Sequence, residues 1–147
     1  MAASAPKHLY IIGIIVLLWN LMGVTDFFMT VTENAAWAQM AIDNGSVTRE
    51  QFDYFYSFPW WSTIPWGLAV FSGLAGLICL LMRKRVAVDL LILSAVMAFA
   101  SNALIVLFLD WTKMMGTASL GMVGFVILLA AGVAFYAKKM RDAGVLN

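Results

Sequence analysis

The stretch that most constrains the fold of this chain is residues 9–30, LYIIGIIVLLWNLMGVTDFFMT. Its first half is almost entirely hydrocarbon, and a run of about 20 apolar residues has the length needed to cross the core of a bilayer. The same stretch places an amide, Asn20, near its middle and a carboxyl, Asp26, near its far end. The sequence therefore predicts a membrane-spanning helix that carries a polar line.

Three further apolar runs have a similar length, so the predicted spans are about 9–29, 62–82, 86–109 and 118–137. The composition agrees, because 63% of the residues are hydrophobic and 12% are charged, against roughly 45–50% and about 25% in soluble domains. We expect an all-α membrane protein in which residues 1–147 form a single domain, an up-down bundle of four transmembrane helices. Residues 110–113 are expected to form the turn between the third and fourth spans.

The basic residues are distributed unevenly between the two sides of these spans. Arg49 and Lys113 fall on one side. The other side carries Lys7, Arg83, Lys84, Arg85, Lys138, Lys139 and Arg141. Because cytoplasmic loops hold the excess of Lys and Arg, both termini are predicted to be cytoplasmic. Trp60, Trp61, Trp66 and Trp111 fall at the opposite boundary, as is typical of an interfacial aromatic belt.

The connection between the first two spans, residues 31–61, is expected to be external and partly helical. The apolar spacing predicts one helix over residues 31–42, ended by Asn44-Gly45. Thr48 and Gln51 fit a capping box, which predicts a second short helix to about residue 57. The segment is interpreted either as a helical lid or as an ordinary amphipathic connector.

Four residues make up the candidate polar line inside the membrane: Asn20, Asp26, Ser101 and Asn102. At 1.5 Å per residue, Asn20 lies about 16 Å along the first span and Asp26 about 9 Å further. Ser101 and Asn102 reach about the depth of Asp26 on the third span, so their depths would allow Asp26 and Asn102 to meet inside the bundle. An ionisable group at membrane depth indicates a functional site, unless Asp26 contacts water at the interface.

Two further sets of residues have predicted structural roles. Asp89 lies one turn inside the third span, close in sequence to Arg83 and Arg85, and is expected either to form an ion pair with them or to act as a topology anchor. Small residues allow close helix packing in lipid. That role is predicted for Gly23, Gly73, Gly76, Gly121 and Gly124.

Several chemistries are not expected. His8 is the only histidine and Cys79 the only cysteine, so no His-based metal site, paired-histidine haem site or intrachain disulfide is predicted. The formal net charge of +1 gives no basic stripe for nucleic acid. We expect neither enzyme activity nor a cofactor.

The run 19–30, WNLMGVTDFFMT, resembles a family of small, uncharacterised four-span membrane proteins of bacteria that are often labelled sugar transporters. Residues 54–66, YFYSFPWWSTIPW, and the step Gly73-Leu74-Ala75-Gly76 before the basic turn at 83–85 share the resemblance, which covers most of the chain in layout. It implies the four-span topology and the bacterial inner (cytoplasmic) membrane.

Two functional classes remain open. The chain is either a non-catalytic accessory or structural subunit, whose partner in the lipid bilayer is another membrane protein or a second copy, or a small oligomeric carrier for a sugar or another small solute. The carrier path would be lined by Asn20, Asp26 and Asn102. The sequence favours the accessory subunit, because it shows no internal repeat and no Gly/Pro break at mid-span, where carriers commonly build their sites.

Overall fold

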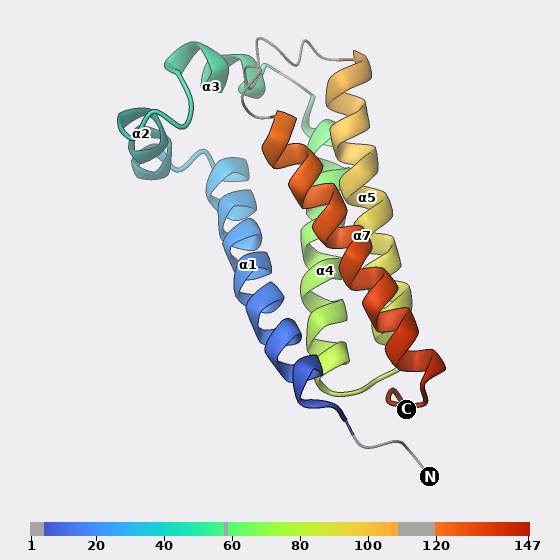
Figure 1. Ribbon diagram of the computed structural model, residues 1–147. Coiled ribbons are helices and arrows are strands. Elements are labelled where there is room, and N and C mark those ends of the chain that lie inside the picture. The colour runs from blue at the N-terminus through green and yellow to red at the C-terminus, as the bar shows by residue number, and fades with distance from the viewer. Residues whose placement is uncertain (1–4, 58, 109–119) are drawn as a thin grey trace.

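The computed structural model describes residues 5–57, 59–108 and 120–147, and its regular elements in these ranges are all helical (Figure 1). In chain order they are α1 (Lys7–Val31), α2 (Ala35–Asp43), α3 (Arg49–Tyr56), the short 3-10 helix η1 (Trp60–Thr63), α4 (Ile64–Leu81), α5 (Val86–Phe108) and α7 (Leu120–Asp142). The predicted turn at 110–113, Trp111 within it and the first residues of the predicted span 118–137 lie outside the described residues.

Four helical stretches are long and apolar enough to cross a membrane: α1, the stretch Trp60–Leu81, α5 and the part Gly121–Asp142 of α7. They run alternately up and down (Figure 1). The predicted all-α bundle with four spans is therefore confirmed. With 25 residues, α1 has a length of about 37 Å at 1.5 Å per residue, which exceeds the roughly 30 Å of a bilayer core.

The last helix continues beyond the predicted boundary at residue 137. Lys139 and Arg141 occupy its last turn, where positive side chains stabilise the carboxyl end of a helix. Gly144, at φ +71°, then ends it. Val145 N donates to Met140 O at 3.0 Å, which completes a Schellman motif.

The connection between α1 and α4 contains both predicted short helices. The first begins at Ala35 rather than at residue 31, because α1 itself continues to Val31. The capping box of the second is present: Gln51 N donates to Thr48 Oγ1 at 3.2 Å, and Thr48 N donates to Gln51 Oε1 at 2.8 Å. This local signal was sufficient to place α3 correctly.

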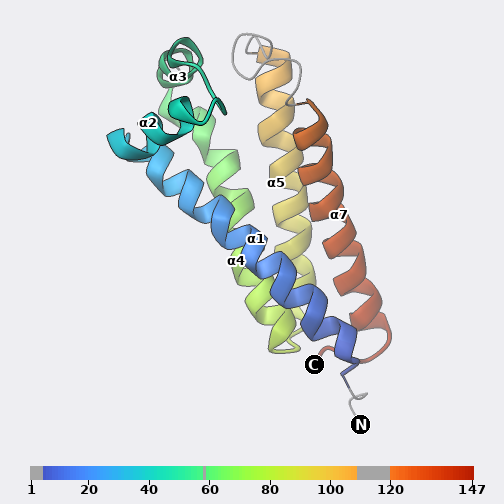
Figure 2. The same ribbon diagram turned by 60° about the vertical axis from the view of Figure 1, so that its left-hand side comes forward.

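The spans pack in the order α1, α4, α5 and α7, so that α4 lies between α1 and α5. α1 crosses α4 obliquely (Figure 2). It also touches α7, through a 2.6 Å hydrogen bond between His8 Nδ1 and Tyr136 OH and through the edge-to-face rings of Trp19 and Phe125, whose centroids are 5.5 Å apart. The four spans therefore form a row in the order α1, α4, α5 and α7, and α1 additionally contacts α7.

That end holds the main buried cluster. It is the end where both termini and the turn between α4 and α5 meet (Figure 1), and we call it the basic end; the opposite end, with α2 and α3, is the loop end. The cluster consists of Leu9, Leu77, Leu80, Ala87, Val88, Leu91, Val133, Ala134, Ala137, Met140, Val145 and Leu146. All four spans and the C-terminal segment contribute to it, so it fixes their arrangement.

α1 and α4 pack by placing a side chain of one helix over a glycine of the other. The pairs are Leu81 over Gly13, Asn20 over Gly73, Val70 over Gly23 and Phe27 over Gly67. Glycine allows two helix backbones to approach closely, which is how helices in lipid gain packing energy.

At the loop end, α3 is attached to the end of α1. Tyr56 OH donates to Thr30 O at 2.6 Å. Burial of the phenol, together with the nearby carboxylates of Glu33 and Asp26, raises the pKa of Tyr56 above its usual value. The phenol therefore keeps its proton at neutral pH and remains a hydrogen-bond donor.

Candidate functional site

Asn20 of α1 lies against Gly73 of α4, at the point where Ser94 of α5 also lies close to that glycine. A Cβ placed on Gly73 of α4 would lie 2.7 Å from Asn20 Nδ2 and 2.8 Å from Ser94 Oγ of α5. Real Cβ atoms essentially never come so close to another atom. Both side chains can lie against α4 at this point only because Gly73 has no Cβ.

Two buried hydroxyls complete this region. Ser94 Oγ donates to Ala69 O of α4 at 2.7 Å, and Ser72 Oγ donates to Leu68 O of its own helix. Both serines were absent from the predicted polar line. A depth comparison would have found Ser94, because it lies about 12 Å along its span from Val86, close to the depth of Asn20.

One polar atom in this region has no partner. Asn20 Oδ1 is buried and accepts no hydrogen bond from the described residues. Leaving a buried acceptor unpaired costs about 1–3 kcal/mol. The amide therefore contributes packing through Nδ2 while its carbonyl opposes folding.

We expect Asn20→Leu to raise the free energy of unfolding by about 1 kcal/mol, because leucine has a similar shape and removes the unpaired carbonyl. Reversible unfolding in mixed micelles measures the change. Asn102→Leu is the matched control, since Asn102 Nδ2 donates to Ala98 O at 2.7 Å and this bond would be lost. A destabilised Asn20→Leu would show that Oδ1 has a partner in the membrane.

The structure does not bring Asp26 and Asn102 together, although their predicted depths would allow it. Asp26 is exposed at the loop end, where its Oδ1 accepts from Trp37 Nε1 of α2 at 3.1 Å. Asn102 bonds within its own helix, beside the half-buried Ser101. The physical reason is that α4 separates α1 from α5. Asp26 therefore joins α1 to α2 and leaves the predicted line incomplete.

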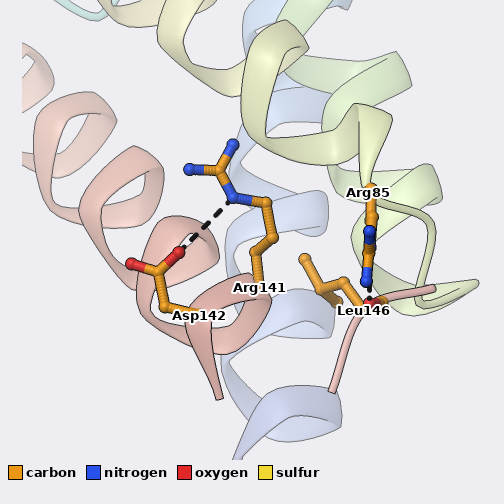
Figure 3. Close-up of polar contacts among 4 residues, drawn as sticks. All are labelled: Arg85, Arg141, Asp142 and Leu146. Carbon is orange, nitrogen blue, oxygen red and sulfur yellow. Dashed lines mark hydrogen bonds and ion pairs between the residues drawn. The ribbon is translucent and has the colours of Figure 1, made fainter. Parts of the chain in front are cut away.

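The predicted ion pair of Asp89 with Arg83 and Arg85 does not form either. Asp89 is exposed. Arg83 Nε instead donates to Val145 O at 3.0 Å, and Arg85 Nε donates to Leu146 O at 3.3 Å, the second of which is drawn in Figure 3. Both arginines thus bind main-chain oxygens of the C-terminal segment.

The C-terminal segment reaches this position by pairing with the turn between α4 and α5. Asn147 N donates to Arg83 O at 2.7 Å, and Arg85 N donates to Asn147 O at 2.9 Å. Arg83 has φ +61°, and its main-chain N donates to Leu80 O while its main-chain O accepts from Asn147 N. The basic turn is therefore held by backbone bonds.

The five glycines with a predicted packing role fall into three groups. A Cβ on Gly76 would lie 2.8 Å from Leu91 Cγ, and a Cβ on Gly73 would lie similarly close to its own neighbours. Gly23 has an ordinary contact with Val70 at 3.6 Å. A Cβ on Gly121 or Gly124 would meet no described atom of another element within 4 Å, so within the described residues neither glycine packs against another helix.

Within residues 5–57, 59–108 and 120–147, no group of three or more His, Cys, Asp or Glu side chains is placed to hold a metal ion. A shallow hollow of about 570 Å³ on α2 is lined by Ala36, Gln39, Met40, Asp43 and Asn44. None of the predicted polar residues lines it.

No family model, curated protein or solved structure matches this chain.

Proposed function

We propose that the protein is a non-catalytic accessory or structural subunit that binds a larger membrane complex from the side, within the bilayer. The observation that carries the proposal is one face of α7. Its residues recur every three or four positions and therefore share one side of the helix. This side, which we call the α7 outward face, consists of Gly121, Gly124, Leu128, Ala131, Gly132 and Phe135.

Glycine backbone is left open along this face. A Cβ on Gly121, Gly124 or Gly132 would meet no described atom within 4 Å, whereas Gly73 is covered on α4. Leu128, between Gly124 and Gly132, is 74% exposed, and Phe135, one turn beyond Gly132, is 71% exposed. Small residues in membrane helices are enriched where another helix approaches. We call the open positions at Gly121, Gly124 and Gly132 notches. Notches and large side chains alternate along this face, and such a surface suits the packing of a partner helix.

The outward face of α1 has a different character. It presents large aliphatic side chains without notches, and these side chains are Ile11, Ile14, Ile15, Leu18 and Met22. Such a face suits lipid, which needs no matching shape. The contrast supports the assignment of the partner to α7.

The location and orientation are part of the same proposal. Seven of the nine basic residues belong to the basic end, which favours a cytoplasmic position for both termini. The resemblance to small four-span proteins favours the bacterial inner membrane.

The alternative is a small oligomeric carrier for a sugar or another small solute. The unpaired Oδ1 of Asn20 favours it. The separation of Asp26 from Asn102 weighs against it, because the polar residues do not form one path.

The test is purification of tagged protein from native membranes in mild detergent, followed by mass measurement of the intact complex. We expect a larger assembly of fixed stoichiometry. Gly132→Val fills a notch on α7, and overpacking costs about 1–3 kcal/mol, so partner recovery should fall by about tenfold.

Leu18→Val is the matched control, since it also places valine at an exposed position, on α1. It should leave recovery unchanged. A homo-oligomer with nothing attached, or equal recovery with Gly132→Val, would contradict the proposal.

A further inference from the structure

We propose that the basic end binds the headgroups of anionic phospholipids in the leaflet that it faces. Three segments far apart in sequence supply the positive charge: the start of α1, the turn between α4 and α5, and the end of α7. All three lie at the same end of the bundle (Figure 1).

The charge at this end is mostly uncompensated. Its acidic side chains are Asp89 and Asp142, of which Asp142 pairs with Arg141 at 3.5 Å (Figure 3). Within the part of the chain that the structure describes, five basic side chains have no carboxylate at ion-pair distance: Lys7, Lys84, Arg85, Lys138 and Lys139. These groups are available to an outside anion.

The charges stand where the apolar helices end. α4 ends at Leu81 and α5 begins at Val86, so Lys84 and Arg85 occupy the short turn between two spans. Lys138 and Lys139 directly follow the buried Ala137 on α7. A lipid that contacts these helices with its chains therefore brings its phosphate to the level of the basic groups. A soluble phosphate would lack the chain contacts.

The basic turn is also preorganised. Its main chain is held by Asn147 through the bonds to Arg83 and Arg85. Arg85 Nε is engaged by Leu146 O, which orients the guanidinium and leaves its other nitrogens without a partner among the described residues. Arginine binds phosphate oxygens through parallel N–H bonds. Little ordering is therefore required when a headgroup binds.

The test is native mass spectrometry of the full chain in mild detergent, titrated with phosphatidylglycerol or with phosphatidylcholine of the same acyl chains. We expect tighter retention of phosphatidylglycerol, weakened at high salt. Each basic residue near the membrane surface contributes about 1 kcal/mol. The double variant Lys138→Gln/Lys139→Gln should therefore lower phosphatidylglycerol affinity by up to about 30-fold.

The matched control removes the chain's two other basic residues, in the variant Arg49→Gln/Lys113→Gln. It should leave the lipid preference unchanged, and circular dichroism should show equal helix content in both variants. Equal retention of the two lipids, equal losses in both variants, or full displacement of phosphatidylglycerol by inorganic phosphate at the same concentration would overturn the proposal.

Discussion

Replacing Leu146 with alanine is expected to lower the free energy of unfolding by about 2–5 kcal/mol, the usual loss when a packed leucine is truncated. The side chain is 1% exposed and belongs to the main buried cluster. Although it lies one residue from the end of the chain, Leu146 contacts the core where all four spans converge.

The effect should extend beyond the lost apolar contact. Leu146 O accepts from Arg85 Nε, and its neighbour Asn147 pairs with the turn between α4 and α5. If the side chain no longer anchors the segment, these bonds become exposed to water and weaken. Hydrogen exchange should therefore rise in the turn as well as in the C-terminal segment.

Asn147→Ala is the control, because Asn147 bonds to the turn through its main-chain N and O alone and its side chain is exposed. It should change stability by less than about 0.5 kcal/mol. Unfolding of both variants in mixed micelles gives the comparison. Equal stability of Leu146→Ala and the wild type would mean that the segment does not hold the basic end.

The parts of the fold that were predictable depend on local sequence. Four spans follow from the lengths of four apolar runs, and α3 follows from the spacing of Thr48 and Gln51. These signals act over a few turns of one helix. They need no information about which helices become neighbours.

The polar residues were harder to place, because the depth of a residue along its helix does not determine which neighbouring helix its side chain faces. Asp26 and Asn102 have similar depths, yet α4 lies between their helices. Likewise, Asp89 and Arg83 are close in sequence, but this closeness did not indicate that Arg83 binds the C-terminal segment instead. The segment 145–147 carries no periodic pattern, so its docking on the turn had no sequence signal.

The sequence also does not show which glycines lie in a contact between two helices and which face outward. Gly73→Val is expected to destabilise the bundle by about 3 kcal/mol, the upper part of the usual cost of overpacking. Its Cβ would lie 2.7 Å from Asn20 Nδ2 and 2.8 Å from Ser94 Oγ. Neither neighbour can withdraw easily, because Ser94 bonds to Ala69 O and Asn20 is inside the contact of α1 with α4.

The same substitution at Gly132, also in the interior of an apolar helix, should change stability by less than about 0.5 kcal/mol, since no described atom lies within 4 Å of the new Cβ. Unfolding in mixed micelles, followed by tryptophan fluorescence, measures both variants. Equal losses would contradict the assignment of Gly73 to an internal contact and of Gly132 to an open face. Loss of stability at Gly73 alone, combined with loss of partner recovery at Gly132, would separate the residues that build the bundle from those that bind its partner.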